Sequence, residues 1–367
     1  MPSPQRTPLF DFNASHGGRM VDFAGWEMPV QFQSIVEEHK ATRTAAGLFD
    51  VSHMGEATVE GPQAEAFLNY ALTNDVSSMD DGKALYSLMC YPNGGVVDDL
   101  LVYRRAENRY LLCLNAANAE KDLRWLATEA ENFDVEVKDV SSCYGLIAVQ
   151  GPRAFEILEP LADRDLSTLG YYRFVEGKID GIDCLISRTG YTGEKGVELF
   201  VSWEETQALA EAVLRAGADL GLALAGLGAR DSLRLEAGYS LYGHEIDEKI
   251  SPVQAGLMWT VSLKKPGDFI GKDALLKEKA EGPTQRIVFF KTGSRRIARP
   301  GTPVVQEGAS VGSVVSGTFS PILNEAIGSA LVDASLVKAE NLAVDLRGKA
   351  FTIELTKPPF LALNPQG

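Results

Sequence analysis

Cysteine is scarce in this chain, which has four thiols, Cys90, Cys113, Cys143 and Cys184, among 367 residues. No two of them form a Cys-x-x-Cys pair, the spacing typical of zinc sites and redox motifs. We therefore expect four reduced thiols, and neither a disulfide framework nor a metal site.

Long apolar runs are also missing. No stretch reaches the ~18 consecutive apolar residues of a membrane span. Residues 1–7 lack the apolar core of a signal peptide. The sequence therefore predicts a cytoplasmic protein with no membrane segment.

Positive charge is in short supply. The chain has 35 Lys and Arg against 50 Asp and Glu, a net charge of −15. Such a chain repels phosphate backbones and anionic lipid. We therefore expect neither nucleic acid nor a membrane as a partner.

The length predicts more than one domain, because single cores rarely grow beyond ~250–300 residues. Residues 33–47 and 63–72 have helical spacing, and Asn118 could cap a helix over 119–132. Alternation and turn residues predict strands at 55–60, 84–90, 96–104, 109–115, 135–139 and 145–150. We expect residues 54–143 to form one α+β layer.

Helical periodicity is lost in the last part of the chain. Short strands are predicted there between Gly, Pro and Asn, near 285–291, 303–306, 311–316, 326–333, 343–347 and 350–355. This spacing is typical of a small β-barrel or sandwich.

Nucleophilic and metal catalysis find little support. Residues 308–312 match the G-x-S-x-G elbow, but a strand instead of a helix is predicted after them, so we interpret them as a hairpin turn. The four histidines, His16, His39, His53 and His244, lack zinc-site spacing.

Carboxylates beside glycines are the main chemical signal. Asp98 and Asp99 follow Gly94-Gly95 at the start of a predicted strand, where successive side chains point to opposite faces. Only one of them can then face a shared cavity. If Val96 and Leu100 lie in the core, Asp98 is a carboxylate beside apolar surface, which must be paired or have a shifted pKa. The alternative is an Asp pair in a surface turn.

Glu198 and Arg230 are the other charged candidates. A buried Glu198, after the Gly-rich turn 189–196, would accept two parallel N–H groups from a ligand. Arg230 and Arg234 lie one helical turn apart and could bind an anion. The alternatives are a cross-strand salt bridge and ion pairs within the helix. Together these residues predict a site for a flat, polar, partly anionic small molecule.

Six runs of the sequence, in order, resemble the aminomethyltransferase family, the T-proteins of the glycine cleavage system. They are residues 18–26 (GRMVDFAGW), 49–54 (FDVSHM), 94–100 (GGVVDDL), 189–194 (TGYTGE), 228–238 (GARDSLRLEAG) and 316–321 (SGTFSP). The resemblance implies an α+β fold, a three-domain cloverleaf. It would consist of a discontinuous folate-binding domain (1–53 plus 144–265), a ferredoxin-like middle domain (54–143) and a small C-terminal β-barrel (280–367).

The resemblance also implies an activity. The methylene carbon of an aminomethyl group would move from the lipoyl arm of the H-protein, the partner, to tetrahydrofolate, the co-substrate. The products would be ammonia and 5,10-methylenetetrahydrofolate, and no metal is implied. Asp98 would be the essential carboxylate, and Glu198 would bind the 2-amino-pyrimidinone edge of the pterin. The remaining folate-site positions would be Tyr86, Asn115, Tyr191, Arg230 and Tyr239.

Two other folate proteins of this fold stay open as alternatives. One is a tetrahydrofolate-dependent demethylase of amines or sulfonium compounds. The other is a non-catalytic iron–sulfur assembly factor, whose Gly-Cys-Tyr-x-Gly-Gln-Glu signature contains a cysteine. Residues 189–194 contain none, and residues 358–367 lack the tyrosine found in the tail of some family members.

Asp98→Asn is expected to lower turnover at least ~100-fold with folate affinity nearly intact, because a fixed negative charge beside a cationic carbon stabilises the transition state. The turnover of the purified variant with tetrahydrofolate measures the effect. Retained turnover would reject the role of Asp98.

Overall fold

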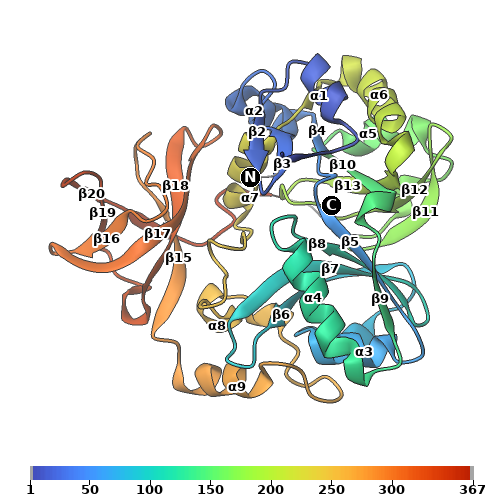
Figure 1. The fold of residues 1–367 in the computed structure, drawn as a ribbon. Helices are drawn as coiled ribbons and strands as arrows, with labels where there is room; N and C mark the ends of the chain where they lie inside the picture. The colour runs from blue at the N-terminus through green and yellow to red at the C-terminus, as the bar shows by residue number, and fades with distance from the viewer. Residues whose placement is uncertain (1–2, 364–367) are drawn as a thin grey trace.

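The computed structural model describes residues 3–363 and forms three lobes around a common centre (Figure 1). The first lobe is built on a six-stranded sheet of order β11-β12-β13-β10-β4-β14. Its strands are β4 (Ala46–Asp50), β10 (Tyr144–Gln150), β11 (Phe174–Ile179), β12 (Ile182–Ser187), β13 (Gly196–Ser202) and β14 (Leu222–Leu224). Between β4 and β10 the chain leaves to build the second lobe, so the first lobe is discontinuous.

Helices and a small sheet complete the first lobe. The helices are α1 (Phe10–Ser15), α2 (Ile35–Thr44), α5 (Ala154–Leu158), α6 (Thr206–Gly217) and α7 (Leu227–Ala237). The small sheet has the order β1 (Gln5–Arg6), β3 (Trp26–Pro29) and β2 (Met20–Phe23). Apolar residues of α5 and α6, such as Ile157 and Leu209, pack on Ile147 and Leu199 of the large sheet. This burial provides the main driving force for the lobe.

The second lobe is a five-stranded sheet of order β6-β7-β8-β5-β9. Its elements are β5 (Gly55–Glu60), α3 (Ala64–Ala71), β6 (Lys83–Cys90), β7 (Val96–Ala106), β8 (Arg109–Leu114), α4 (Ala119–Glu129) and β9 (Glu136–Asp139). This is the β-α-β-β-α-β pattern of a ferredoxin-like domain with one strand more. Phe67 of α3 and Leu126 of α4 cover one face of the sheet, and Tyr103 and Leu111 on the other face pack against the first lobe.

The third lobe is a curled seven-stranded sheet of order β20-β19-β16-β17-β18-β15-β21. Its strands are β15 (Gln285–Lys291), β16 (Pro303–Gln306), β17 (Ala309–Ser320), β18 (Glu325–Asp333), β19 (Leu342–Asp345), β20 (Ala350–Thr352) and β21 (Glu354–Thr356). Helices α8 (Pro252–Ala255) and α9 (Lys272–Glu281) precede it, and Val253 and Leu275 pack on Leu88 of the second lobe. None of the helices in residues 3–363 combines the length and the hydropathy of a membrane span. The predicted domain boundaries stay a prediction.

Two local expectations were wrong. The helix predicted over 33–47 ends at Thr44, and residues Ala46–Asp50 form β4. This strand is buried on both faces, so it has no period-2 pattern that a sequence could reveal. Asn118 precedes α4 but makes no capping bond there, because its side-chain amide is used elsewhere. A hairpin at the G-x-S-x-G match is confirmed, but its turn is Glu307-Gly308, at φ 52° and 86°, and residues 309–312 already belong to β17.

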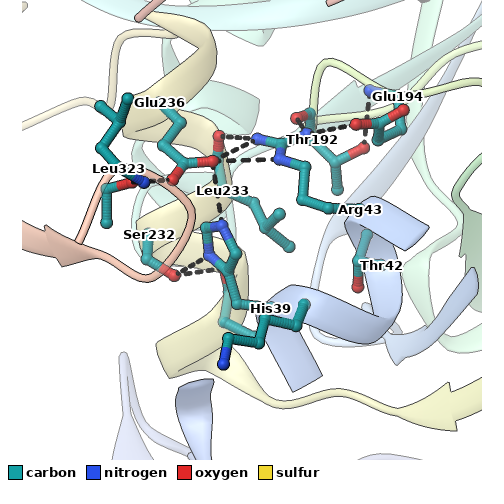
Figure 2. A network of polar contacts seen from close by, with 12 residues as sticks. His39, Thr42, Arg43, Thr192, Glu194, Ser232, Leu233, Glu236 and Leu323 are labelled. Atoms are coloured by element: carbon teal, nitrogen blue, oxygen red, sulfur yellow. Dashed lines mark hydrogen bonds and ion pairs between the residues drawn. The ribbon is translucent and has the colours of Figure 1, made fainter. Parts of the chain in front are cut away.

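Helix α7 links the lobes through buried charge. The Glu236 carboxylate accepts hydrogen bonds from His39 Nε2 at 2.9 Å, from Arg43 Nε at 3.0 Å and from the Ser320 hydroxyl of the barrel. Arg43 also donates to Glu194 of the Gly-rich turn at 2.9 Å (Figure 2). Burial opposes ionisation of Glu236, but the bonds and charges from His39 and Arg43 outweigh it and hold its pKa below the usual value.

Two residues earlier on α7, Arg234 makes a second link. Its guanidinium donates to Glu245 at 3.0 Å and to the Ser316 hydroxyl of the barrel at 2.8 Å. The side chains of Arg234 and Glu245 are 1% and 0% exposed. The guanidinium and the carboxylate are therefore paired with each other where water does not reach.

Arg234→Leu is expected to lower the free energy of unfolding by about 3–5 kcal/mol, because it leaves Glu245 as an uncompensated buried charge. Arg124→Leu is the matched control, since Arg124 and Glu120 form an ion pair that is 73% and 88% exposed. It should cost at most about 0.5 kcal/mol. Urea unfolding of both variants measures the two losses in free energy of unfolding. Equal losses would contradict the structural role given to the buried Arg234–Glu245 pair.

Candidate active site

A cavity of about 750 Å³ lies where the first two lobes meet α7 and the segment that follows it. Six of the seven residues proposed from the sequence line it: Tyr86, Asn115, Tyr191, Glu198, Arg230 and Tyr239. Asp98 is the exception. Its neighbour Asp99 lines the cavity instead.

A β-bulge in β7 explains why Asp99 and not Asp98 lines the cavity. Met89 of β6 pairs with Asp98 and Cys90 pairs with Val96, so Val97 is an extra residue. The bulge breaks the strict alternation assumed from the sequence. Val97 instead of Val96 packs in the helix-covered core, and Asp98 is fully buried behind the cavity wall.

Asp99 is held by two side chains of the cavity. Its Oδ2 accepts a hydrogen bond from the Tyr86 hydroxyl at 3.0 Å, and its Oδ1 accepts one from Asn115 Nδ2 at 2.9 Å. Burial and the charge of Asp98 raise the pKa of Asp99 to about 7, although both hydrogen bonds oppose the rise. A carboxyl with this pKa exchanges a proton readily near neutral pH.

Glu198 faces the cavity from β13. The Thr189 hydroxyl donates to its Oε2, and its Oε1 accepts no hydrogen bond from residues 3–363. Burial raises its pKa, against the hydrogen bond from Thr189 and the charge of Arg230. One carboxylate oxygen is thus available to a donor on a ligand.

Arg230 and two tyrosines add a positive charge and two aromatic rings to the cavity lining. The guanidinium of Arg230 lies 4.6 Å from the centre of the Tyr191 ring. The rings of Tyr191 and Tyr239 are stacked 5.8 Å apart with an interplanar angle of 23°. The Tyr191 hydroxyl donates to the Ser240 carbonyl, which fixes the ring. Flat aromatic faces next to a positive charge suit a flat ligand with an anionic part.

Several lining residues were missed from the sequence, among them His53 and Trp259. Burial and the charge of Arg230 lower the pKa of His53 to about 3, so its imidazole is neutral. Trp259 is 67% exposed and stacks on Tyr86 with ring centres 5.7 Å apart. No spacing distinguishes either residue from ordinary core or surface residues. Within the described range no group of three His, Cys, Asp or Glu residues is placed to hold a metal ion.

Comparisons with known proteins cover almost the whole chain. The GCVT N-terminal domain matches residues 9–265, and the glycine cleavage T-protein C-terminal barrel domain matches residues 285–361. An aminomethyltransferase of Caldanaerobacter subterraneus is 47% identical over 98% of this chain and 96% of that protein. One from Bacillus subtilis is 46% identical over 97% of this chain and 99% of that protein. The crystal structure of the glycine cleavage system aminomethyltransferase T from Bartonella henselae has a TM-score of 0.93 and 33% identity, with 100% of both chains covered.

The raised pKa of Asp99 predicts a specific pH dependence of stability. The folded protein binds this proton more tightly than the unfolded chain, whose carboxyl has the usual value of 3.8. The stabilising contribution is therefore complete below about pH 4 and is lost as the pH rises through about 7. Asp99→Asn should gain stability relative to the wild type over that range.

Urea unfolding at several pH values measures this gain, with the exposed Asp273→Asn as the control. If the difference in free energy of unfolding between Asp99→Asn and the wild type stays constant with pH, the raised pKa of Asp99 is contradicted.

Proposed function

Because this chain belongs to the glycine cleavage T-protein family and is an aminomethyltransferase, we propose that it transfers a methylene carbon from the lipoyl arm of the H-protein to tetrahydrofolate. Ammonia, the reduced lipoyl arm and 5,10-methylenetetrahydrofolate are the products. The observation that carries the proposal is Asp99, which lies on the wall of a cavity that also contains Glu198 and Arg230.

In the proposed function, Glu198 binds and orients the pterin of the folate. The 2-amino-pyrimidinone edge of a reduced pterin presents two N–H donors, which one carboxylate can accept side by side. Oε1 of Glu198 accepts no bond from residues 3–363, and Oε2 can accept a second bond beside that of Thr189, so both oxygens are available to the two donors. Arg230 supplies a positive charge for the anionic tail, and the stacked rings of Tyr191 and Tyr239 supply apolar faces.

Asp99 supports the transfer. When the carbon–sulfur bond breaks, its electron pair stays on the lipoyl sulfur and the carbon becomes an iminium-like cation. A folate nitrogen forms the new carbon–nitrogen bond with its lone pair and then loses a proton. The amino group takes up one proton and leaves as ammonia, and the second folate nitrogen attacks the carbon and loses its own proton, which completes the methylene bridge. The lipoyl sulfur takes up the other proton. A carboxylate beside the carbon stabilises its positive charge and can accept a proton from the folate amine.

The catalytic role predicted for Asp98 is accordingly proposed for Asp99. Asp98 is fully buried, and its Oδ1 accepts hydrogen bonds from Asn115 and Asn118, at 3.0 Å each. It does not line the cavity, whereas Asp99 does. A group must be within reach of the reacting atoms to stabilise their charge directly.

Asp99→Asn is expected to lower turnover by at least ~100-fold with little change in folate affinity, because it removes the charge and keeps the shape. Asp98→Asn is the matched neighbour. The loss of at least ~100-fold expected for it from the sequence is replaced by a loss of less than ~10-fold, since its amide oxygen still accepts the bonds of Asn115 and Asn118. Ammonia release from aminomethylated lipoyl carrier protein and tetrahydrofolate measures both variants. A larger loss of turnover in Asp98→Asn than in Asp99→Asn would show that Asp98 has the catalytic role.

The same assay separates the alternative functions. Dimethylglycine and dimethylsulfoniopropionate replace the carrier protein in parallel reactions. Ammonia from the carrier alone supports the proposal. Turnover of a free small molecule alone would indicate a demethylase, and folate binding without any turnover would indicate an assembly factor.

A further inference from the structure

A second pair of acids lies behind the cavity wall, outside the chemistry described so far. Asp98 of β7 and Asp122 of α4 are both 0% exposed. Asp98 Oδ2 and both carboxyl oxygens of Asp122 are buried and accept no hydrogen bond from a nitrogen or hydroxyl donor within residues 3–363. Three buried acceptor atoms without a donor carry a large desolvation cost unless something supplies one.

A proton bound between Asp98 and Asp122 would remove most of this desolvation cost. Two neighbouring carboxylates cannot both remain ionised out of water. One protonated carboxyl provides an O–H donor, and the other accepts it. Burial, a hydrogen bond to Asp98 and the charge of Asp98 together raise the pKa of Asp122 to about 10.

Other charged and titratable groups around the pair do not replace that proton. Lys121 Nζ is 3.6 Å from Asp122 Oδ1, but it donates to the Val97 carbonyl and lies 4.2 Å from the centre of the Tyr242 ring. Burial raises the pKa of Tyr91 and Tyr242, so both hydroxyls are neutral at pH 7. The pKa of Tyr86, which faces Asp99, is also raised by burial.

The pair is joined to the cavity through one amide. Asn115 Nδ2 donates to Asp98 Oδ1 at 3.0 Å and to Asp99 Oδ1 at 2.9 Å. The charge of Asp98 is also one of the causes that raise the pKa of Asp99. The charge on Asp98 and Asp122 therefore influences the pKa of Asp99 in the cavity.

We propose that Asp98 and Asp122 share one proton, and that Asp122 thereby acts as a positioning residue that limits the charge of the two carboxyls to a single negative unit. With two charges there, Asp99 would stay protonated and could not stabilise a cationic carbon. With none, Asp99 would be a weaker base. The consequence for catalysis rests on the proposed function, whereas the shared proton does not.

Two variants separate the proton from a merely structural role. Asp122→Asn keeps one charge and replaces the O–H donor by N–H, so the acid limb of the pH profile of kcat/KM should stay at the wild-type position. Asp98→Asn combined with Asp122→Asn removes the charge, and the acid limb should move down by at least ~1 pH unit. An unmoved limb in the double variant, or an equal shift in the single variant, would overturn the proposal.

Infrared spectroscopy tests the proton without any turnover. The wild type at pH 7 should show a protonated-carboxyl C=O band that is absent from Asp122→Asn and therefore remains in the wild-type-minus-variant difference spectrum, while thermal unfolding confirms that the variant is folded. Glu56→Gln is the control, because burial also raises the pKa of Glu56 and its band should be lost independently. No band assignable to Asp122 would overturn the shared proton. If the Asp122 band is present but the protein has no transferase activity, the shared proton is supported and the proposed function is rejected.

Discussion

The arrangement of the three lobes depends on charges that α7 holds out of water. Arg234 pairs with Glu245 and bonds the barrel through Ser316, and Glu236 bonds the barrel through Ser320 while it pairs with Arg43. Buried pairs of this kind contribute little net stability compared with apolar packing, but each breaks at a high cost if the geometry changes. They therefore fix how the barrel sits against the helix. The residues that follow on the same helix and its C-terminal turn, including Tyr239, line the cavity.

The cavity itself concentrates acids in a place where burial opposes their ionisation. Burial raises the pKa of Glu198 and of Asp99, the latter to about 7, and the chain as a whole is also acidic. Such carboxyls gain most from a cation or a pair of N–H donors that arrives with a ligand. A reduced pterin and an iminium-like carbon provide both. On this account the cost of burying the acids is the source of their selectivity for that chemistry.

Much of this could be predicted from the sequence where a local pattern determines the structure. The α+β layer of residues 54–143 and the C-terminal β-lobe followed from periodicity, and six of the residues lining the cavity followed from short motifs that resemble a family. The bulge at Val97 could not be predicted, because it depends on how β6 and β7 pair, and it decides which of two adjacent acids meets the cavity. Asp122 was also invisible, since an acid in the first turn of a helix usually faces solvent.

A crystal structure of this protein with bound tetrahydrofolate would show whether Asp99 meets the reacting nitrogens. We expect the 2-amino-pyrimidinone edge of the pterin within hydrogen-bond distance of Glu198, and the Asp99 carboxyl beside the nitrogens that accept the carbon. A pterin bound with Asp99 remote from those nitrogens, or outside this cavity, would contradict this expectation.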